Sequence, residues 1–124
     1  MFKIIYCLRR LPHLTHEEFY QYWREIHGPL VKKHAEVLRI RRYIQQPSIE
    51  NVKIQEKIRA TRNTEIADYD GVAELWWDSL EDHAEPRRSQ EGVAAADALL
   101  EDEKRFIDLS RSRIWYATER EIIS

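Results

Sequence analysis

The chain has 124 residues, a size that suits one domain over residues 1–124, and its formal net charge of -2 gives no field that would attract a polyanion. Charged residues make up 34% of the chain with both signs interspersed, and no apolar run is long enough to cross a bilayer, so we expect neither nucleic acid nor membrane as a partner. Cys7 is the single cysteine, which excludes an internal disulfide and a cysteine-rich metal site, and the first residues do not form a signal peptide, so we expect a cytoplasmic protein.

The first two elements are predicted by composition and by a helix-capping pattern. β-branched and aromatic side chains dominate residues Phe2–Leu8, which predicts a strand. Thr15 is a good helix N-cap, and Glu18 three residues later completes a capping box, so a helix is expected to begin directly after Thr15. Apolar, aromatic and histidine side chains then recur at three- and four-residue spacings as far as His34, which predicts one buried face.

This helical pattern is cut by His27-Gly28-Pro29. Proline lacks an amide hydrogen and its ring collides with the carbonyl four residues back, so we expect a long helix with a kink at this point. An imidazole, whose unperturbed pKa lies close to neutral pH, stands directly before the break at the end of an aromatic stripe.

The rest of the chain supplies three more strands and a second helical region. Alternating side chains over residues 38–46 predict a strand that ends at Pro47, and turn chemistry at residues 68–71 precedes a third strand at residues 72–77. Residues 50–66 are polar and weakly periodic, and we expect an inserted loop with either a helical turn or a strand extension near residues 52–58. The last elements are a short helix over residues 80–83, a helical segment from Pro86 to about residue 100, and a strand over residues 111–118.

The order β-α-β, then β-α-β, predicts an α+β fold of the ferredoxin-like type, with an antiparallel sheet and its helices on one face. In the third strand Val72, Glu74 and Trp76 point to one side, whereas Ala73, Leu75 and Trp77 point to the other and are expected to pack under the helices. Both faces therefore carry large apolar groups, which indicates a homodimer whose sheets pack together, with a cavity on the second face.

His27 is the first candidate for a general acid or base, since imidazole can move a proton in either direction near neutral pH. The alternative is a structural histidine that holds the break by bonding a freed carbonyl. His34 lies seven residues further on the same stripe, roughly 10 Å away along the backbone, which is too far for the pair to share a metal easily. It is either a second acid or base, a binding group, or a structural or solvent-facing residue.

Glu74 is the candidate carboxylate, because it lies in mid-strand on the same side as Val72 and Trp76. A carboxylate that lines a cavity there should have a raised pKa and act as a proton carrier, and the alternative is an ion pair with Arg42 or Arg113. Asp70 is kept as a weak substrate-binding candidate beside its expected role in a turn.

Aromatic side chains could form a wall for a flat ring, with the tyrosine hydroxyls orienting it, although such spacings are also typical of a core. The candidates for this wall are Tyr22, Trp23, Tyr43, Trp76 and Tyr116. No nucleophile elbow and no glycine-rich phosphate loop is present, so neither hydrolase nor nucleotide chemistry is indicated.

Four segments form a pattern that reaches almost across the chain: F-x-x-Y-W-R-E-I-H-G-P-L at 19–30, R-Y-I-Q at 42–45, D-G-V-A-E-L-W-W at 70–77 and F-I-D at 106–108. In these segments the chain resembles the EthD-domain family. The resemblance implies the dimeric α+β barrel superfamily, a ferredoxin-like fold and a cavity between each sheet and its covering helix.

Members and near relatives of that family include lactone isomerases such as methylmuconolactone methylisomerase, polyketide dehydratases and cyclases, and proteins encoded beside oxygenases. The resemblance therefore implies proton transfer on a small cyclic, lactone, aromatic or polyketide-like substrate, with no metal or organic cofactor. The alternative is a non-catalytic barrel that binds a small ligand or supports an oxygenase. The inserted segment 50–66 is longer than the link in the shortest members and could lid or narrow the cavity.

Overall fold

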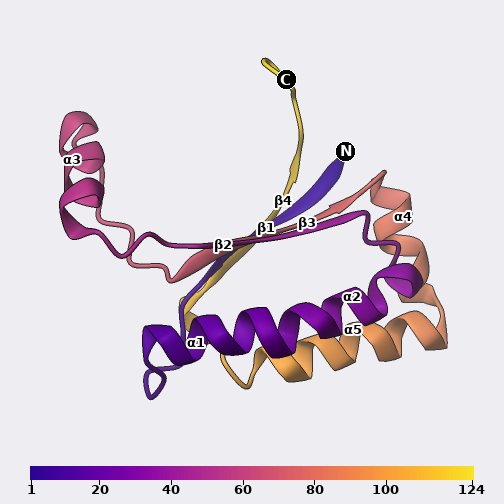
Figure 1. Cartoon of the computed structure of the whole chain (residues 1–124). Helices are drawn as coiled ribbons and strands as arrows, with labels where there is room; N and C mark the ends of the chain where they lie inside the picture. Colours follow the sequence, from indigo (N-terminus) through magenta and orange to yellow (C-terminus); the bar gives the residue numbers. More distant parts are fainter.

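The computed structural model describes residues 1–124 and contains one four-stranded antiparallel sheet covered by helices on one face (Figure 1). The sheet has the strand order β2-β3-β1-β4. Its strands are β1 (Phe2–Leu8), β2 (Arg42–Pro47), β3 (Gly71–Trp77) and β4 (Arg113–Thr118). The expected ferredoxin-like α+β architecture is confirmed, with β1 and β3 in the centre of the sheet.

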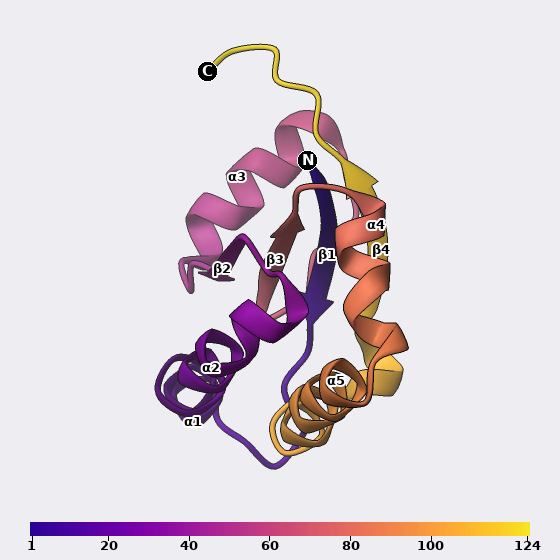
Figure 2. The ribbon, with the colours of Figure 1, turned by 90° about the vertical axis from the view of Figure 1, so that its right-hand side faces the viewer.

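Two long helical segments lie side by side beneath the sheet, as both Figure 1 and Figure 2 show. The first consists of α1 (His16–Tyr22), a π-helical turn (Trp23–His27) and α2 (Gly28–Leu38), and the second is α5 (Gln90–Glu103). Shorter elements are α3 (Val52–Arg62), α4 (Leu80–Ala84) and 3₁₀ turns at Glu85–Arg88 and Leu109–Arg111. None of the helices combines the length and the apolar composition that a membrane-spanning helix requires.

The helix start at Thr15 is confirmed, since the hydroxyl of Thr15 accepts a hydrogen bond from the Glu18 amide at 3.1 Å and the Glu18 carboxylate accepts one from the Thr15 amide at 2.9 Å. The helix that we expected to kink at His27-Gly28-Pro29 continues through these residues and has an irregular turn directly before them. His27 and Gly28 both have right-handed helical backbone angles, and Pro29 lies in the first turn of α2, where its missing amide hydrogen is tolerated. A single π-turn, in which the Gly28 amide donates to the Trp23 carbonyl, carries the helix through.

Side chains of the central strands alternate between the two faces, as predicted. Ala73 and Trp77 are buried against the helices, and the Trp77 indole donates to the Leu38 carbonyl at 2.8 Å. One part of the core gathers around Phe19, Trp23 and Phe106. A second cluster joins α2 to α5 through Val31, Leu38, Ala95 and Leu99.

The segment between β2 and β3 differs most from expectation. We expected a loop with either a helical turn or a strand extension near residues 52–58, and the structure has an eleven-residue helix, α3. Its first turn is capped by the Asn51 side chain, which accepts from the Ile54 amide at 3.2 Å. In Figure 1 this helix stands apart from the sheet, on the side opposite α1, α2 and α5. It therefore does not cover the space between the sheet and the helices of its own chain.

Candidate functional site

Two hollows of the molecule, of very different size, contain predicted site residues. The inner one, of about 40 Å³, lies between the sheet and the helix layer and is lined by side chains from both. The outer one is an open groove of about 790 Å³ between α3 and the ends of β2 and β3. Three of the predicted site residues, His27, Trp23 and Tyr43, line the inner cavity and one, Asp70, lines the outer groove, so the site is built from the inner cavity.

His27 lines the inner cavity and is buried. It comes from the π-turn, and its ring packs against Phe106 with 5.0 Å between the centroids. Its Nδ1 lies 2.8 Å from Oδ2 of Asp102 on α5. Because an ionised carboxylate only accepts hydrogen bonds, Nδ1 carries the proton and Nε2 is left as the basic nitrogen. Burial lowers the pKa of His27, although the hydrogen bond and charge of Asp102 oppose this effect.

Asp102 is held by three donors. Besides His27, it accepts a hydrogen bond of 2.6 Å from the Tyr22 hydroxyl and one of 3.1 Å from the Arg105 guanidinium. Burial raises the pKa of the Asp102 carboxyl, but the hydrogen bonds from Tyr22, His27 and Arg105 outweigh burial and leave the pKa below its usual value. Asp102 therefore remains ionised and fixes both the orientation and the tautomer of His27.

A second carboxyl, Glu103, also lines the cavity and follows Asp102 in the sequence. It accepts one hydrogen bond, of 2.9 Å, from the Tyr6 hydroxyl on β1. Burial raises the pKa of Glu103 and the nearby Asp102 charge raises it further, whereas the bond from Tyr6 only partly opposes them. The cavity thus contains a histidine that favours its neutral form and a carboxyl that favours its protonated form, which is the pairing expected of a base and an acid.

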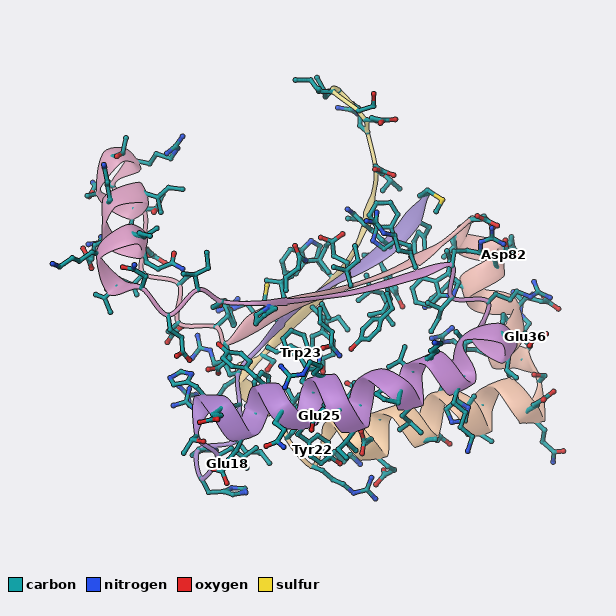
Figure 3. The ribbon with its side chains drawn as sticks, in the orientation of Figure 1. Glu18, Tyr22, Trp23, Glu25, Glu36 and Asp82 are labelled. Atoms are coloured by element: carbon teal, nitrogen blue, oxygen red, sulfur yellow. The ribbon has the colours of Figure 1, made fainter.

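The wall of the cavity facing β2 is aromatic. The Trp23 indole donates to the Tyr43 hydroxyl at 3.2 Å, and the Gln45 amide donates both to that hydroxyl and to the Trp23 carbonyl, at 3.0 and 2.8 Å. Burial raises the pKa of Tyr43 to about 12, so it stays a neutral phenol. A Cβ at position 28 would lie 3.2 Å from the Gln45 amide nitrogen, so glycine there leaves room for this contact. Figure 3 shows Trp23 between the helix and the sheet.

Of the predicted site residues, His27, Trp23 and Tyr43 line the inner cavity, and Tyr22 reaches it through Asp102. Glu74 and Trp76 do not, because they lie on the open face of the sheet. We expected a cavity on that second face, whereas the inner cavity lies between the sheet and the helices, which is the position that the family resemblance implied. The sheet separates Glu74 from His27.

The expected rise in the pKa of Glu74 is also wrong. Burial does raise the pKa of Glu74, but hydrogen bonds from Lys3 at 3.2 Å, Gln46 at 3.1 Å and the Trp76 indole at 3.1 Å outweigh burial and leave the pKa below its usual value. The ion pair foreseen as the alternative exists, although its cation is Lys3 and not Arg42 or Arg113.

The remaining candidates lie elsewhere. His34 is half-buried on α2 and does not line the cavity. Tyr116 is exposed at the far end of β4 and packs on Phe2, with 5.1 Å between the centroids. Asp70 lines the outer groove, where its carboxylate accepts from Arg10 Nη1 at 2.7 Å and lies 2.9 Å from His16 Nδ1.

Sequence reasoning did not single out Tyr6, Asp102 and Glu103. The run Glu101-Asp102-Glu103 has the composition of a solvated helix end. A signal was nevertheless present, since Asp102 continues the buried stripe of Gly92, Ala95 and Leu99 at helical spacing. A carboxylate on an apolar stripe needs a hydrogen-bond partner when it is buried, and a histidine on another buried stripe, such as His27, can be that partner. No group of three His, Cys, Asp or Glu side chains is placed to hold a metal ion.

Comparison with protein families gives a match to the EthD domain over residues 11–110. The chain belongs to the EthD family. The match covers both helical segments of the cavity and the strands β2 and β3. No curated protein matches the chain significantly.

Solved structures confirm the fold of this EthD protein. An ethyl tert-butyl ether D (EthD) family protein from Bacillus halodurans is 17% identical, with a TM-score of 0.64 over 97% of this chain and 99% of that one. A dimeric protein of unknown function with a ferredoxin-like fold, from Bacteroides fragilis, is 11% identical, with a TM-score of 0.55 over 94% and 93%. A cofactor-independent oxygenase from Streptomyces nogalater is 13% identical, with a TM-score of 0.52 over 98% and 93%.

Proposed function

We propose that this EthD protein is a cofactor-independent enzyme that moves a proton on a small cyclic substrate, as a dehydratase, isomerase or cyclase. One observation carries the proposal: His27, held by ionised Asp102, and Glu103, with a raised pKa, line the same buried cavity. A pair of titratable groups, one held in its basic form and the other in its acidic form, is characteristic of acid–base catalysis.

In the proposed mechanism, Nε2 of His27 takes a proton from a carbon next to a carbonyl. Asp102 stabilises the imidazolium that forms, through the hydrogen bond to Nδ1. Glu103 donates its proton to the oxygen on which negative charge develops, or to a departing hydroxyl. The Tyr6 hydroxyl, which is bonded to Glu103, holds the resulting carboxylate in place. After release of the product, the imidazolium proton returns to Glu103 through water.

The lining of the cavity suits an apolar substrate. Nine of its eleven lining residues are hydrophobic, and these include Val31, Leu75 and Leu99. A volume of about 40 Å³ admits water and not a ring, since an apolar cavity of about 150 Å³ is needed for benzene. We therefore expect these side chains to move apart when a lactone, aromatic or polyketide-like substrate enters.

We also propose that the protein acts as a homodimer. The face of the sheet away from the helices carries Ile5, Ile44, Val72 and Trp76, and the edge strand β4 exposes Trp115. An apolar face next to an unpaired edge strand is typical of a sheet that packs on a second copy.

Deuterium incorporation tests the proposed chemistry without knowledge of the natural substrate. A panel of small lactones, cyclic ketones and β-hydroxy ketones is incubated with the protein in D₂O, and exchange at the enolisable carbon is followed by NMR. We expect catalysed exchange for some of the panel and a loss of about 10²- to 10⁴-fold in His27→Ala. Glu74→Gln is the matched control, because Glu74 lies on the other face. Equal rates for His27→Ala and the unaltered protein would exclude the mechanism.

A non-catalytic role, in which the barrel binds a small apolar ligand or supports an oxygenase, is the second candidate. The mostly apolar and aromatic lining of the cavity, which includes Trp23 and Tyr43, favours it, and here too the side chains must move apart for a ring to enter. In that case ring compounds bind with the same affinity to the unaltered protein and to His27→Gln in calorimetry, and no member of the panel undergoes exchange.

A further inference from the structure

Two hydrogen bonds reach the Tyr43 hydroxyl, and in both of them its oxygen is the acceptor. The Trp23 indole nitrogen, 3.2 Å away, can only donate. Nε2 of Gln45 is 3.0 Å from the same oxygen and 2.8 Å from the Trp23 carbonyl oxygen, which can only accept. This carbonyl fixes the orientation of the Gln45 amide, with its NH₂ group towards Tyr43. The hydroxyl oxygen therefore accepts twice, and its own proton is not used in either bond.

The proton of the Tyr43 hydroxyl has no acceptor within the chain. The two other tyrosines next to the site each have one, since Tyr6 donates to Glu103 at 2.9 Å and Tyr22 donates to Asp102 at 2.6 Å. Tyr43 is half-buried and lines the inner cavity. Polar groups inside proteins are almost always hydrogen-bonded, so an unused donor in the wall of a cavity indicates a ligand that brings the acceptor.

The two bonds that Tyr43 accepts make it a better donor. Burial raises the pKa of Tyr43 to about 12, and the bonds from Gln45 and Trp23 oppose this rise because they favour negative charge on the oxygen. The phenol therefore keeps its proton near neutral pH. Because hydrogen bonds in a chain polarise one another, a carbonyl oxygen that accepts from Tyr43 is held more strongly than by an isolated phenol.

We propose that Tyr43 binds the carbonyl oxygen of the substrate, next to the carbon from which His27 removes a proton. The C–H electron pair moves to this oxygen, the proton moves to Nε2 of His27, and Tyr43 keeps its own proton. Negative charge develops on the oxygen, so the bond from Tyr43 strengthens as the enolate forms. Glu103 lines the same cavity, and its charge raises the pKa of Tyr43, so both donors are near the oxygen. The inference rests on the proposed function, because it takes the inner cavity as the substrate site.

Binding of a ketone and of a hydrocarbon of the same shape tests this role. The probes are cyclohexanone labelled with ¹³C at the carbonyl, and methylenecyclohexane, which has no acceptor. In Tyr43→Phe we expect about tenfold weaker binding of cyclohexanone and unchanged binding of methylenecyclohexane in NMR titrations. The ¹³C resonance of the bound ketone should move towards its position in an apolar solvent. Tyr20→Phe is the matched control, because the Tyr20 hydroxyl donates to the Asp70 carbonyl at 2.9 Å and does not line the inner cavity.

The same variant also tests whether the bond strengthens during the reaction. In the D₂O assay with cyclohexanone, Tyr43→Phe should lower the exchange rate by about 10²- to 10³-fold, which is a larger loss than the loss in binding. A structural role in the cavity wall would instead weaken both probes equally.

The outcomes separate Tyr43 from the base. The role of Tyr43 is overturned if both probes bind equally weakly in Tyr43→Phe, if the ¹³C resonance and the affinity for cyclohexanone do not change, or if cyclohexanone does not bind to the unaltered protein. In each case the His27→Ala assay still decides the proposed chemistry. If Tyr43→Phe has the expected effect on binding but the unaltered protein catalyses no exchange, Tyr43 is retained as a donor to a carbonyl ligand and the chemistry of His27 is overturned.

Discussion

The carboxyl groups of Glu103 and Glu74 lie on opposite sides of the sheet, and their pKa values are shifted in opposite directions. Glu103, under the sheet, has one neutral hydroxyl as its hydrogen-bond partner, and its pKa is raised. Glu74, on the open face, is bonded by an ammonium, an amide and an indole, and its pKa is lowered. Burial acts in the same direction on both, so the donors around each carboxyl decide whether it is suited to donate a proton.

The largest expected difference between the two faces is in catalysis. In the D₂O exchange assay, Glu103→Gln should lower the rate by about 10²- to 10⁴-fold, since the amide keeps the shape but cannot supply an acidic proton. Glu74→Gln should leave the rate within about twofold, because the sheet separates it from the cavity. If the Glu74 variant loses activity and the Glu103 variant keeps it, the acid lies on the open face and the site proposed here is the wrong one.

The next difference is in stability, measured by urea unfolding at pH 7. Asp102→Ala leaves the His27 and Tyr22 donors buried without their acceptor, and we expect a loss of about 3 kcal/mol. Glu74→Ala removes an ion pair with Lys3 at the sheet surface and should cost only about 1 kcal/mol. Asp102→Asn serves as the control for shape, with a smaller loss than Asp102→Ala. Equal losses for the two alanine variants would show that the dyad has no special role in the fold.

Much of this comparison could be anticipated from single segments, and the rest could not. The alternation of β3 placed Glu74 and Trp76 on one face correctly, and the capping box located the start of α1. The partner of Glu74 was missed because Lys3 is 71 residues away and reaches it through the register that pairs β1 with β3. Such a register depends on the whole sheet and is not encoded in either strand alone.

Two other differences have local causes. The π-turn was missed because Gly28-Pro29 is compatible with both a break and a helix that restarts at proline. The side chain that bonds the Trp23 carbonyl of this turn, Gln45, comes from a strand 22 residues away. Helix α3 was expected only as one of two alternatives within a loop, a helical turn or a strand extension, because its weak, polar periodicity carries no sign of burial. In the structure none of its residues is buried. A helix is recognised in a sequence mainly by the regular spacing of its apolar residues, and α3 lacks this spacing.

A smaller effect is the pH dependence of folding stability, to which Glu103 and Glu74 contribute with opposite sign. A raised pKa in the folded state, as for Glu103, stabilises the fold below the unfolded pKa of about 4.3, and this stabilisation is lost as pH rises through the folded pKa. For Glu74 the pKa is lowered, so its stabilisation is present above about 4.3 and is lost as pH falls through the folded pKa. Relative to the unaltered protein, Glu103→Gln should therefore gain stability as pH rises above about 4.3. Glu74→Gln should instead lose stability relative to the unaltered protein as pH rises from the folded pKa of Glu74 to about 4.3, with no further change above it, as unfolding at a series of pH values would show.

The smallest effect is a shift in the titration of His27, observed through its ring protons by NMR. Burial lowers the pKa of His27 and Asp102 opposes it, whereas His83, buried on Trp77 with no carboxylate partner, has a pKa lowered to about 4 by burial and by the nearby Arg87 charge. We expect the pKa of His27 to lie below its usual value and to fall further in Asp102→Asn, because the variant lacks the charge that favours the imidazolium. A neutral His27 at pH 7 is a base ready to accept a proton. A titration above 7 in the free protein would mean that Asp102 prevails over burial, and His27 would then enter the reaction as the acid, with Glu103 as the base.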